Sequence, residues 1–207
     1  MPRASLISIV CVFLLGLPLT AQQTPPASPV PVGSLGGKDV AVMPITLIAI
    51  DPVFDADTLF QQYREHRSAL NWADSLIGRA LTTRAPEVKW VLPPRLRKLA
   101  RRAPGLVDDP DEMGQAMLRS TKLKEIPDQL RVSLRNLMAL TDGRVVLVPA
   151  ALGFSKDTDG RIRAELSLVA VDARSGRILW RSTPVGSGVT PAAALTGALE
   201  AVLPVDQ

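Results

Sequence analysis

Residues 143–188 read GRVVLVPAALGFSKDTDGRIRAELSLVAVDARSGRILWRSTPVGSG and contain the clearest pattern in this chain of 207 residues. Three apolar runs, separated by the short segments KDTDG and RSG, occupy 144–154, 161–173 and 177–183. In the middle run, apolar and polar residues alternate from Ile162 to Leu168, which is the period of a half-buried antiparallel strand. Gly160 and Gly176 stand in the two connections, where a short hairpin needs a residue tolerant of positive φ. The stretch therefore predicts a three-stranded antiparallel meander.

Such a meander buries too little apolar surface to be stable alone, so other elements must cover it. The near-continuous apolar segment DVAVMPITLIAID predicts another strand at about Val40–Ile48, buried on both faces. A short strand is predicted at Val88–Leu92, which ends where two prolines remove donors from the ladder. We therefore predict an α/β fold class: one mixed β-sheet with a C-terminal antiparallel meander, covered by helices.

Helical patterns fill the segments between the predicted strands. Helices are expected over 55–84, over 95–103, from Asp109, from Pro127 to Gly143, and from Pro191 after a Thr190 cap. The start at Asp109 is the clearest of these, because Pro110 suits the first helical position and Glu112 would complete a capping box.

The N-terminal residues carry the features of a secretory signal peptide. A basic start precedes the apolar run Leu6–Leu19, and Ala21 is a suitable cleavage site, although an uncleaved membrane anchor is the alternative. Cys11 is the sole cysteine and lacks a preceding lipobox, so lipidation is not expected. We therefore divide the chain into a signal peptide (1–21), a linker rich in Pro, Ser and Gly (22–38), and a single α/β domain (39–204).

Residues that could carry catalysis are scarce. His66 is the single histidine, no G-x-S-x-G motif occurs, and a chain cleaved at Ala21 would have no cysteine. The acidic residues 108–112 are explained by the expected helix start, and Asp157–Gly160 matches only the beginning of a calcium loop, so we interpret it as a hairpin turn. We predict no catalytic, cofactor or metal site, while two carboxylates distant in sequence could still meet in the fold.

One short segment is strongly basic. Five cations crowd the predicted helix at 95–103, namely Arg95, Arg97, Lys98, Arg101 and Arg102. Behind a signal peptide, such a helix suits an anionic membrane surface, lipopolysaccharide or a partner subunit, and a merely solvated basic face is the alternative. Only 4% of the residues are aromatic, which argues against a stacking platform for single-stranded nucleic acid, and we expect no nucleic-acid partner.

Four segments together resemble the CsgG-like group of bacterial envelope proteins, which includes the amino-terminal domain of TolB. These segments are VAVMPI, KWVLPPRL, VVLVPAAL and VDARSGRILWR, and the resemblance extends from Asp39 to Leu203. It implies helices packed on a mixed sheet and a role in envelope assembly or transport without catalysis. The chain departs from the group in having neither a lipobox cysteine nor an insertion for transmembrane hairpins, and no propeller follows the last helix.

The sequence thus predicts an exported, non-catalytic protein of the periplasm, or of the periplasmic face of the outer membrane, in a diderm bacterium. It would bind an envelope partner or itself, with the basic helix as the candidate contact. The alternative is an enzyme that acts on an envelope polymer through carboxylates.

Overall fold

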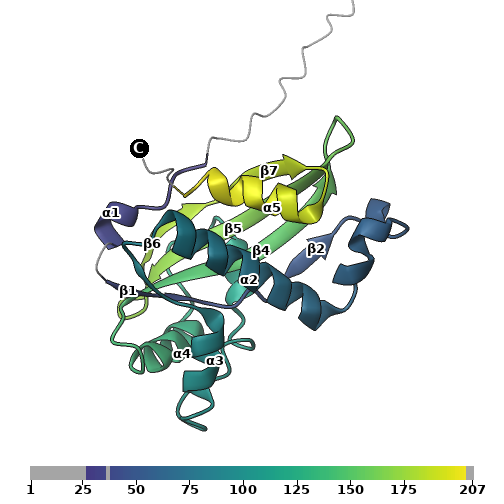
Figure 1. Cartoon of the computed structure of the whole chain (residues 1–207). Coiled ribbons are helices and arrows are strands. Elements are labelled where there is room, and N and C mark those ends of the chain that lie inside the picture. Colours follow the sequence, from purple (N-terminus) through teal and green to yellow (C-terminus); the bar gives the residue numbers. More distant parts are fainter. Residues whose placement is uncertain (1–26, 36–37, 204–207) are drawn as a thin grey trace, which may run out of the picture.

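Seven strands form one mixed β-sheet in the computed structural model, which describes residues 27–35 and 38–203 (Figure 1). The strands are β1 (Asp39–Val42), β2 (Ile48–Ile50), β3 (Lys89–Val91), β4 (Val145–Lys156), β5 (Ile162–Asp172), β6 (Ile178–Ser182) and β7 (Val185–Gly188). Their order is β3-β1-β4-β5-β6, with β2 also paired to β4 and β7 to β5. The pairs that involve β1 and β2 are parallel, whereas β5 is antiparallel to β4, β6 and β7. The predicted fold class and meander are confirmed.

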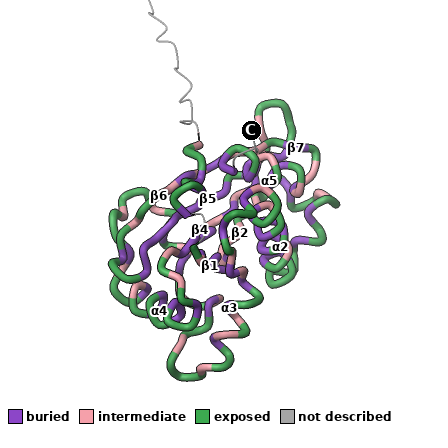
Figure 2. Tube along the Cα trace, turned by 60° about the vertical axis from the view of Figure 1, so that its left-hand side comes forward, coloured by how far each residue is buried: buried purple, intermediate pink, exposed green. Residues whose placement is uncertain are grey.

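Helices cover both faces of this sheet. They are α1 (Val32–Leu35), α2 (His66–Arg84), α3 (Pro93–Ala100), α4 (Asp128–Met138) and α5 (Pro191–Glu200), with 3-10 turns η1 (Pro52–Phe54), η2 (Thr58–Tyr63) and η3 (Gln115–Arg119). Helices α2 and α5 bury their apolar sides in one core, and α3, α4 and η3 bury theirs in a second core across the sheet. Figure 2 shows the buried strands running through the middle of the molecule. None of the helices in the described ranges is both long and apolar enough to cross a membrane.

The two cores explain why β5 is more buried than its alternating pattern predicts. Ile162 and Ala164 face the first core, as expected, but Val169 and Val171 lie in the second core. From Leu166 onward, every residue of the strand is buried. The half-buried interpretation therefore holds only for the first part of β5, because α4 and η3 cover the other face of the rest.

The strand predicted at Val40–Ile48 joins the same sheet as the meander, but it is broken into β1 and β2. Both halves pair in parallel with β4, and the register of β4 shifts between Pro149 and Ala151. Pro149 has no N–H group to donate to a neighbouring strand, so the ladder is interrupted there. The chain leaves the sheet at 43–47 and rejoins it at β2.

The helix predicted from Asp109 is absent, so this prediction is wrong. Asp109 instead accepts a hydrogen bond from the backbone N–H of Asp111 (3.0 Å), and residues 109–113 form turns. Gly114 follows at a φ of 72°, which a right-handed helix does not allow. The helix expected over 55–84 is likewise shorter, because Glu65 caps α2 and the preceding residues form η1 and η2.

The segment before the predicted domain adds contacts that the sequence did not indicate. Val30, Val32 and Leu35 are buried in the first core, and the Val30 N–H donates to the Val202 carbonyl (2.8 Å), so this part of the expected linker packs on the domain. Residues 1–26, including the predicted signal peptide and its cleavage site, lie outside the described residues. Thr190 caps α5 as predicted, by accepting from the Ala193 N–H (3.1 Å).

Strand β7 was not predicted, and it packs directly against α5. A Cβ atom at Gly186 would overlap the backbone nitrogen of Ala198 and lie 2.6 Å from the carbonyl carbon of Gly197. At Gly188 it would lie 2.6 Å from the backbone nitrogen of Ala194. The two glycines therefore allow the strand and helix backbones to approach more closely than side chains would permit.

Candidate functional site

The basic segment forms α3, which begins at Pro93 directly after β3. Proline suits the first turn of a helix, and Leu96 and Ala100 bury the inner side of α3 in the second core. The five predicted cations divide between two environments. Four are exposed: Arg95 and Lys98 lie on α3, and Arg101 and Arg102 lie in the turn directly after it. Within the described residues none of these four has an ion-pair partner.

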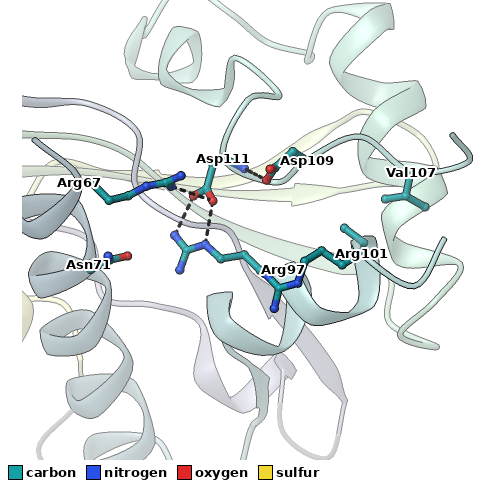
Figure 3. A pocket seen from close by; sticks show the side chains of 8 residues that line it. Arg67, Asn71, Arg97, Arg101, Val107, Asp109 and Asp111 are labelled. Atoms are coloured by element: carbon teal, nitrogen blue, oxygen red, sulfur yellow. Dashed lines mark hydrogen bonds and ion pairs between the residues drawn. The ribbon is translucent and has the colours of Figure 1, made fainter. Parts of the chain in front are cut away.

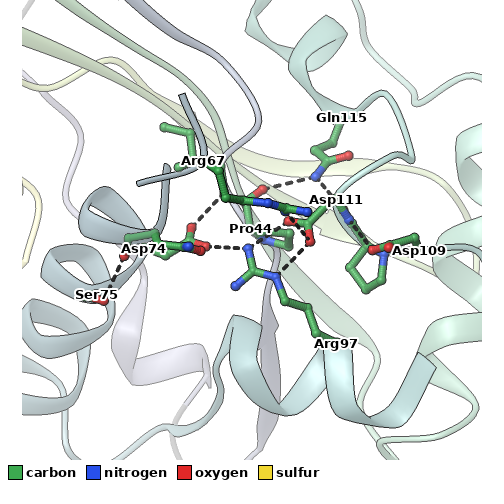
Figure 4. Close-up of polar contacts among 11 residues, drawn as sticks. Pro44, Arg67, Asp74, Ser75, Arg97, Asp109, Asp111 and Gln115 are labelled. Carbon is green, nitrogen blue, oxygen red and sulfur yellow. Dashed lines mark hydrogen bonds and ion pairs between the residues drawn. The ribbon is translucent and has the colours of Figure 1, made fainter. Parts of the chain in front are cut away.

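Arg97 points inward, which corrects its assignment to the basic surface (Figures 3 and 4). Its Nη2 lies 2.7 Å from Oδ1 of Asp111 and 2.8 Å from Oδ2 of Asp74, and its Nε lies 2.9 Å from Oδ2 of Asp111. The side chains are 17% exposed for Arg97, 14% for Asp111 and 5% for Asp74. Arg97 therefore joins two largely buried carboxylates and is not available at the surface.

This ion cluster also supports the break between β1 and β2. Asp74, on α2, accepts a hydrogen bond from the Ile45 N–H through Oδ1 (2.8 Å). Gln115, at the start of η3, donates from Nε2 to the carbonyls of Pro44 (3.0 Å) and Pro110 (2.8 Å). Figure 4 shows these contacts converging from separate segments. The network satisfies backbone groups that the interrupted ladder leaves free.

Hydrogen bonding and burial shift the pKa values of the three charged groups in the cluster. Hydrogen bonding to Arg97 lowers the pKa of Asp111, and the same bond raises the already high pKa of Arg97. Burial raises the pKa of Asp74, although the bonds from Ile45 and Arg97 oppose this effect. The positive charge of Arg97 is therefore retained throughout the physiological pH range.

Asp74 and Asp111 are carboxylates distant in sequence that meet in the fold, as the enzyme alternative requires. All four of their oxygens are occupied, since Asp74 accepts from Ile45 and Arg97, and Asp111 accepts from Arg97 and Arg67. A carboxylate bonded in this way is poorly placed to accept a proton from a substrate. The arrangement is that of a structural ion cluster.

A hollow of about 400 Å³ adjoins the cluster, and Figure 3 shows Arg67 and Asn71 from α2 on one side of it. Its lining comprises Arg67, Asn71, Arg97, Ala100, Arg101, Val107, Asp109 and Asp111. A larger hollow of about 1050 Å³ is lined by residues of η3 and of strands β2, β4 and β5. Its two carboxylates are also engaged, because Asp51 caps η1 and Glu165 lies 3.0 Å from Arg163.

The other candidate residues have the surroundings expected of them. His66 is the exposed first residue of α2. Asp157 accepts from the N–H groups of Asp159 (3.0 Å) and Arg161 (2.8 Å), and Gly160 has a φ of 77°, so the segment forms a hairpin turn. Within 27–35 and 38–203, no group of His, Cys, Asp and Glu side chains is arranged to hold a metal ion.

The ion cluster was missed because two of its members had a local explanation. Asp111 fitted a helix start, and Arg97 fitted a basic face. Asp74 gave the one available signal, since it stands among the buried residues Ala73 and Ile77 on the apolar side of α2. A charged residue at such a position is rarely buried without a partner.

No protein-family model and no curated protein sequence matches this chain. Among solved structures, it is similar to PelC from Paraburkholderia phytofirmans, described as a dodecamer, with 14% identity, coverage of 87% of this chain and 96% of that chain, and a TM-score of 0.39. It is also similar to the C-terminal domain of LpoB from Salmonella enterica (12% identity, 74% and 84% coverage, TM-score 0.39). A third neighbour is the lipoprotein GNA1162 from Neisseria meningitidis (14% identity, 72% and 80% coverage, TM-score 0.33). Similarity at this level is remote and assigns the chain to no family, so membership of the CsgG-like group stays a prediction.

Proposed function

We propose that this protein is a non-catalytic component of a bacterial cell envelope, and that it acts in assembly or transport by docking the exposed basic face of α3 on an anionic partner. The single observation that carries this proposal is the exposure of four cations, on α3 and the turn directly after it, without carboxylate partners in the described chain. Because Arg97 is held by Asp74 and Asp111, the binding surface consists of Arg95, Lys98, Arg101 and Arg102.

The proposed location rests on the sequence. The signal-like residues 1–21 support export, and the resemblance to the CsgG-like group supports the periplasm or the periplasmic face of the outer membrane of a diderm bacterium. We propose three kinds of partner: an envelope protein, an anionic membrane surface or a second copy of the chain. Nucleic acid is not among them.

The enzyme alternative gains no support from the carboxylates that the fold brings together. Asp74 and Asp111 are engaged by Arg97, and Asp51 and Glu165 by a helix cap and an ion pair. Acid–base chemistry needs a convergent pair of carboxylates, and in the pair that the fold brings together, Asp74 and Asp111, every oxygen accepts a hydrogen bond.

The test is a variant in which Arg95, Lys98, Arg101 and Arg102 are all replaced by Gln while Arg97 is retained. Capture of partners from envelope extract should fall and lose most of its salt dependence, because exposed charges attract over about one Debye length. A matched control replaces four exposed cations elsewhere, namely Arg79, Lys89, Lys156 and Arg161. Both variants should unfold at nearly the wild-type temperature, since exposed substitutions usually change stability by about 0.5 kcal/mol or less.

Equal capture by the α3 variant and the wild type would remove α3 from the binding surface. Light scattering on the eluted protein distinguishes self-association from capture of another protein. Hydrolysis of envelope polymers by a monomer that captures nothing would favour the enzyme instead.

A further inference from the structure

We infer that the anionic partner of α3 is a phospholipid bilayer, and that the loop directly after α3 inserts Leu106 into it. The inference rests on the proposed function and specifies its ligand. Its evidence is the exposure of Leu106, the ordered turn that holds this residue outward, and the exposed cations of the segment that precedes it.

Leu106 is 75% exposed, the highest value among the large exposed hydrophobic residues in the described part of the chain. The turn that presents it is ordered, since the N–H groups of Leu106 (3.1 Å) and Val107 (3.2 Å) both donate to the Ala103 carbonyl. Gly105 adopts a φ of 78°, which turns the chain at this point. Val107 packs against the second core, so the loop is fixed at its base while Leu106 points away.

Four exposed cations precede the loop, on α3 and in the turn directly after it. Arg95, Lys98 and Arg102 follow the spacing of one helix face and line a hollow of about 320 Å³ together with Leu99. Arg101 is the C-cap residue of α3 and lines the hollow beside the ion cluster. An apolar tip beside a basic face is the arrangement by which peripheral proteins bind anionic membranes, through apolar insertion and attraction to headgroups.

The position of the loop allows contact with a flat surface. In Figure 1, α3 and the loop below it form one extremity of the molecule, while α5 lies at the opposite side, and Figure 2 shows the same loop projecting beyond α3 and α4. Its neighbours Pro104 and Gly105 are exposed and offer little further apolar area. A stable protein interface needs a contiguous buried patch, whereas peripheral binding to a bilayer combines a small inserted apolar area with attraction to anionic headgroups.

The direct test places a fluorescent reporter at the tip. A chain that starts at Gln22 contains no cysteine, so Leu106→Cys introduces a unique labelling site. An environment-sensitive dye there should shift to shorter wavelength with vesicles that contain phosphatidylglycerol, and not with pure phosphatidylcholine vesicles. The same dye at Val189→Cys is the matched control, because Val189 is 71% exposed and precedes α5, away from α3. No shift at position 106, or equal shifts at both positions, would overturn the inference.

Vesicle sedimentation separates this inference from the proposed function. Leu106→Ser should weaken binding to phosphatidylglycerol vesicles about tenfold, and each cation replaced by Gln about fivefold, while Val189→Ser binds like the wild type. Loss of binding in the fourfold Gln variant but not in Leu106→Ser would reject insertion and leave the basic surface intact. If the wild-type protein does not bind vesicles but captures an envelope protein through α3, the bilayer is not the partner and the proposed function stands. Unchanged capture and unchanged vesicle binding in the fourfold variant would reject both.

Discussion

Replacing Arg97 by Gln should destabilise the fold strongly, whereas replacing Arg101, four residues later on the same segment, should not. Arg97 makes three hydrogen bonds of 2.7–2.9 Å to Asp74 and Asp111. Removing it leaves two largely buried carboxylates side by side without a cation. Loss of one partner from such a pair costs about 3–5 kcal/mol. Arg101 is exposed and unpaired in the described residues, so its replacement should change stability by about 0.5 kcal/mol or less.

Thermal and urea unfolding measure this difference directly. For a domain of this size, 1 kcal/mol corresponds to about 2–4 °C in Tm, so Arg97→Gln should lower Tm by roughly 6–20 °C. A double-mutant cycle with Asp74→Asn should return a coupling free energy well above the scatter of about 0.5 kcal/mol seen for independent sites. If the Arg97→Gln and Arg101→Gln variants unfold at the same temperature, the ion cluster does not stabilise the fold. Arg97 would then have to be counted among the surface cations.

Two further predictions concern the same fold. Because the pKa of Asp111 is lowered in the folded state, the stability it contributes is complete above the ordinary aspartate pKa of about 4 and is lost as the pH falls through the folded value. The gap in unfolding free energy between wild type and Asp111→Asn should therefore be constant near neutral pH and shrink below about pH 4 in urea titrations; a constant gap down to acid unfolding would contradict this. Gly186→Ala should cost about 1–3 kcal/mol or more, because the new methyl group meets the α5 backbone, whereas Gly33→Ala, with nothing within 4 Å, should be nearly neutral in thermal unfolding.

Features encoded by neighbouring residues were predictable from the sequence. Gly160 and Gly176 both have a φ of 77° in the hairpin turns, and Thr190 caps α5, because turn and cap chemistry depends on a few adjacent residues. The apolar stripe of α4 predicted that helix and the side that it buries. The alternation at the start of β5 predicted that strand and the face that it buries there. These local patterns suffice for the class of fold and for most of its helices and strands.

Features that depend on distant residues were not predictable in the same way. The interruption between β1 and β2 is matched by the irregularity at Pro149 in β4, about a hundred residues along the chain. The helix start at Asp109 has the right residues, but Gly114 and the bonds from Arg97 to Asp111 favour a turn. The orientation of Arg97 likewise depends on Asp74 in α2, so the sequence indicated a five-cation surface where the fold presents four.

The antiparallel part of the sheet is continuous in sequence, and this has a consequence for the order of folding. All antiparallel strand pairs of the sheet lie within 145–188, and α5 follows at once. The parallel pairs of β1 join residues much farther apart in the chain, since Val40 pairs with Trp90 of β3 and with Val145 of β4. Closing long loops costs more chain entropy and slows the pairings that need them. We expect 145–200 to collapse first and to expose the edge of β4 until the N-terminal half arrives. Helices α2 and α3 and the ion cluster between them belong to this N-terminal part, which we expect to fold later. We therefore expect the basic surface to form last, so that only the fully folded chain presents it.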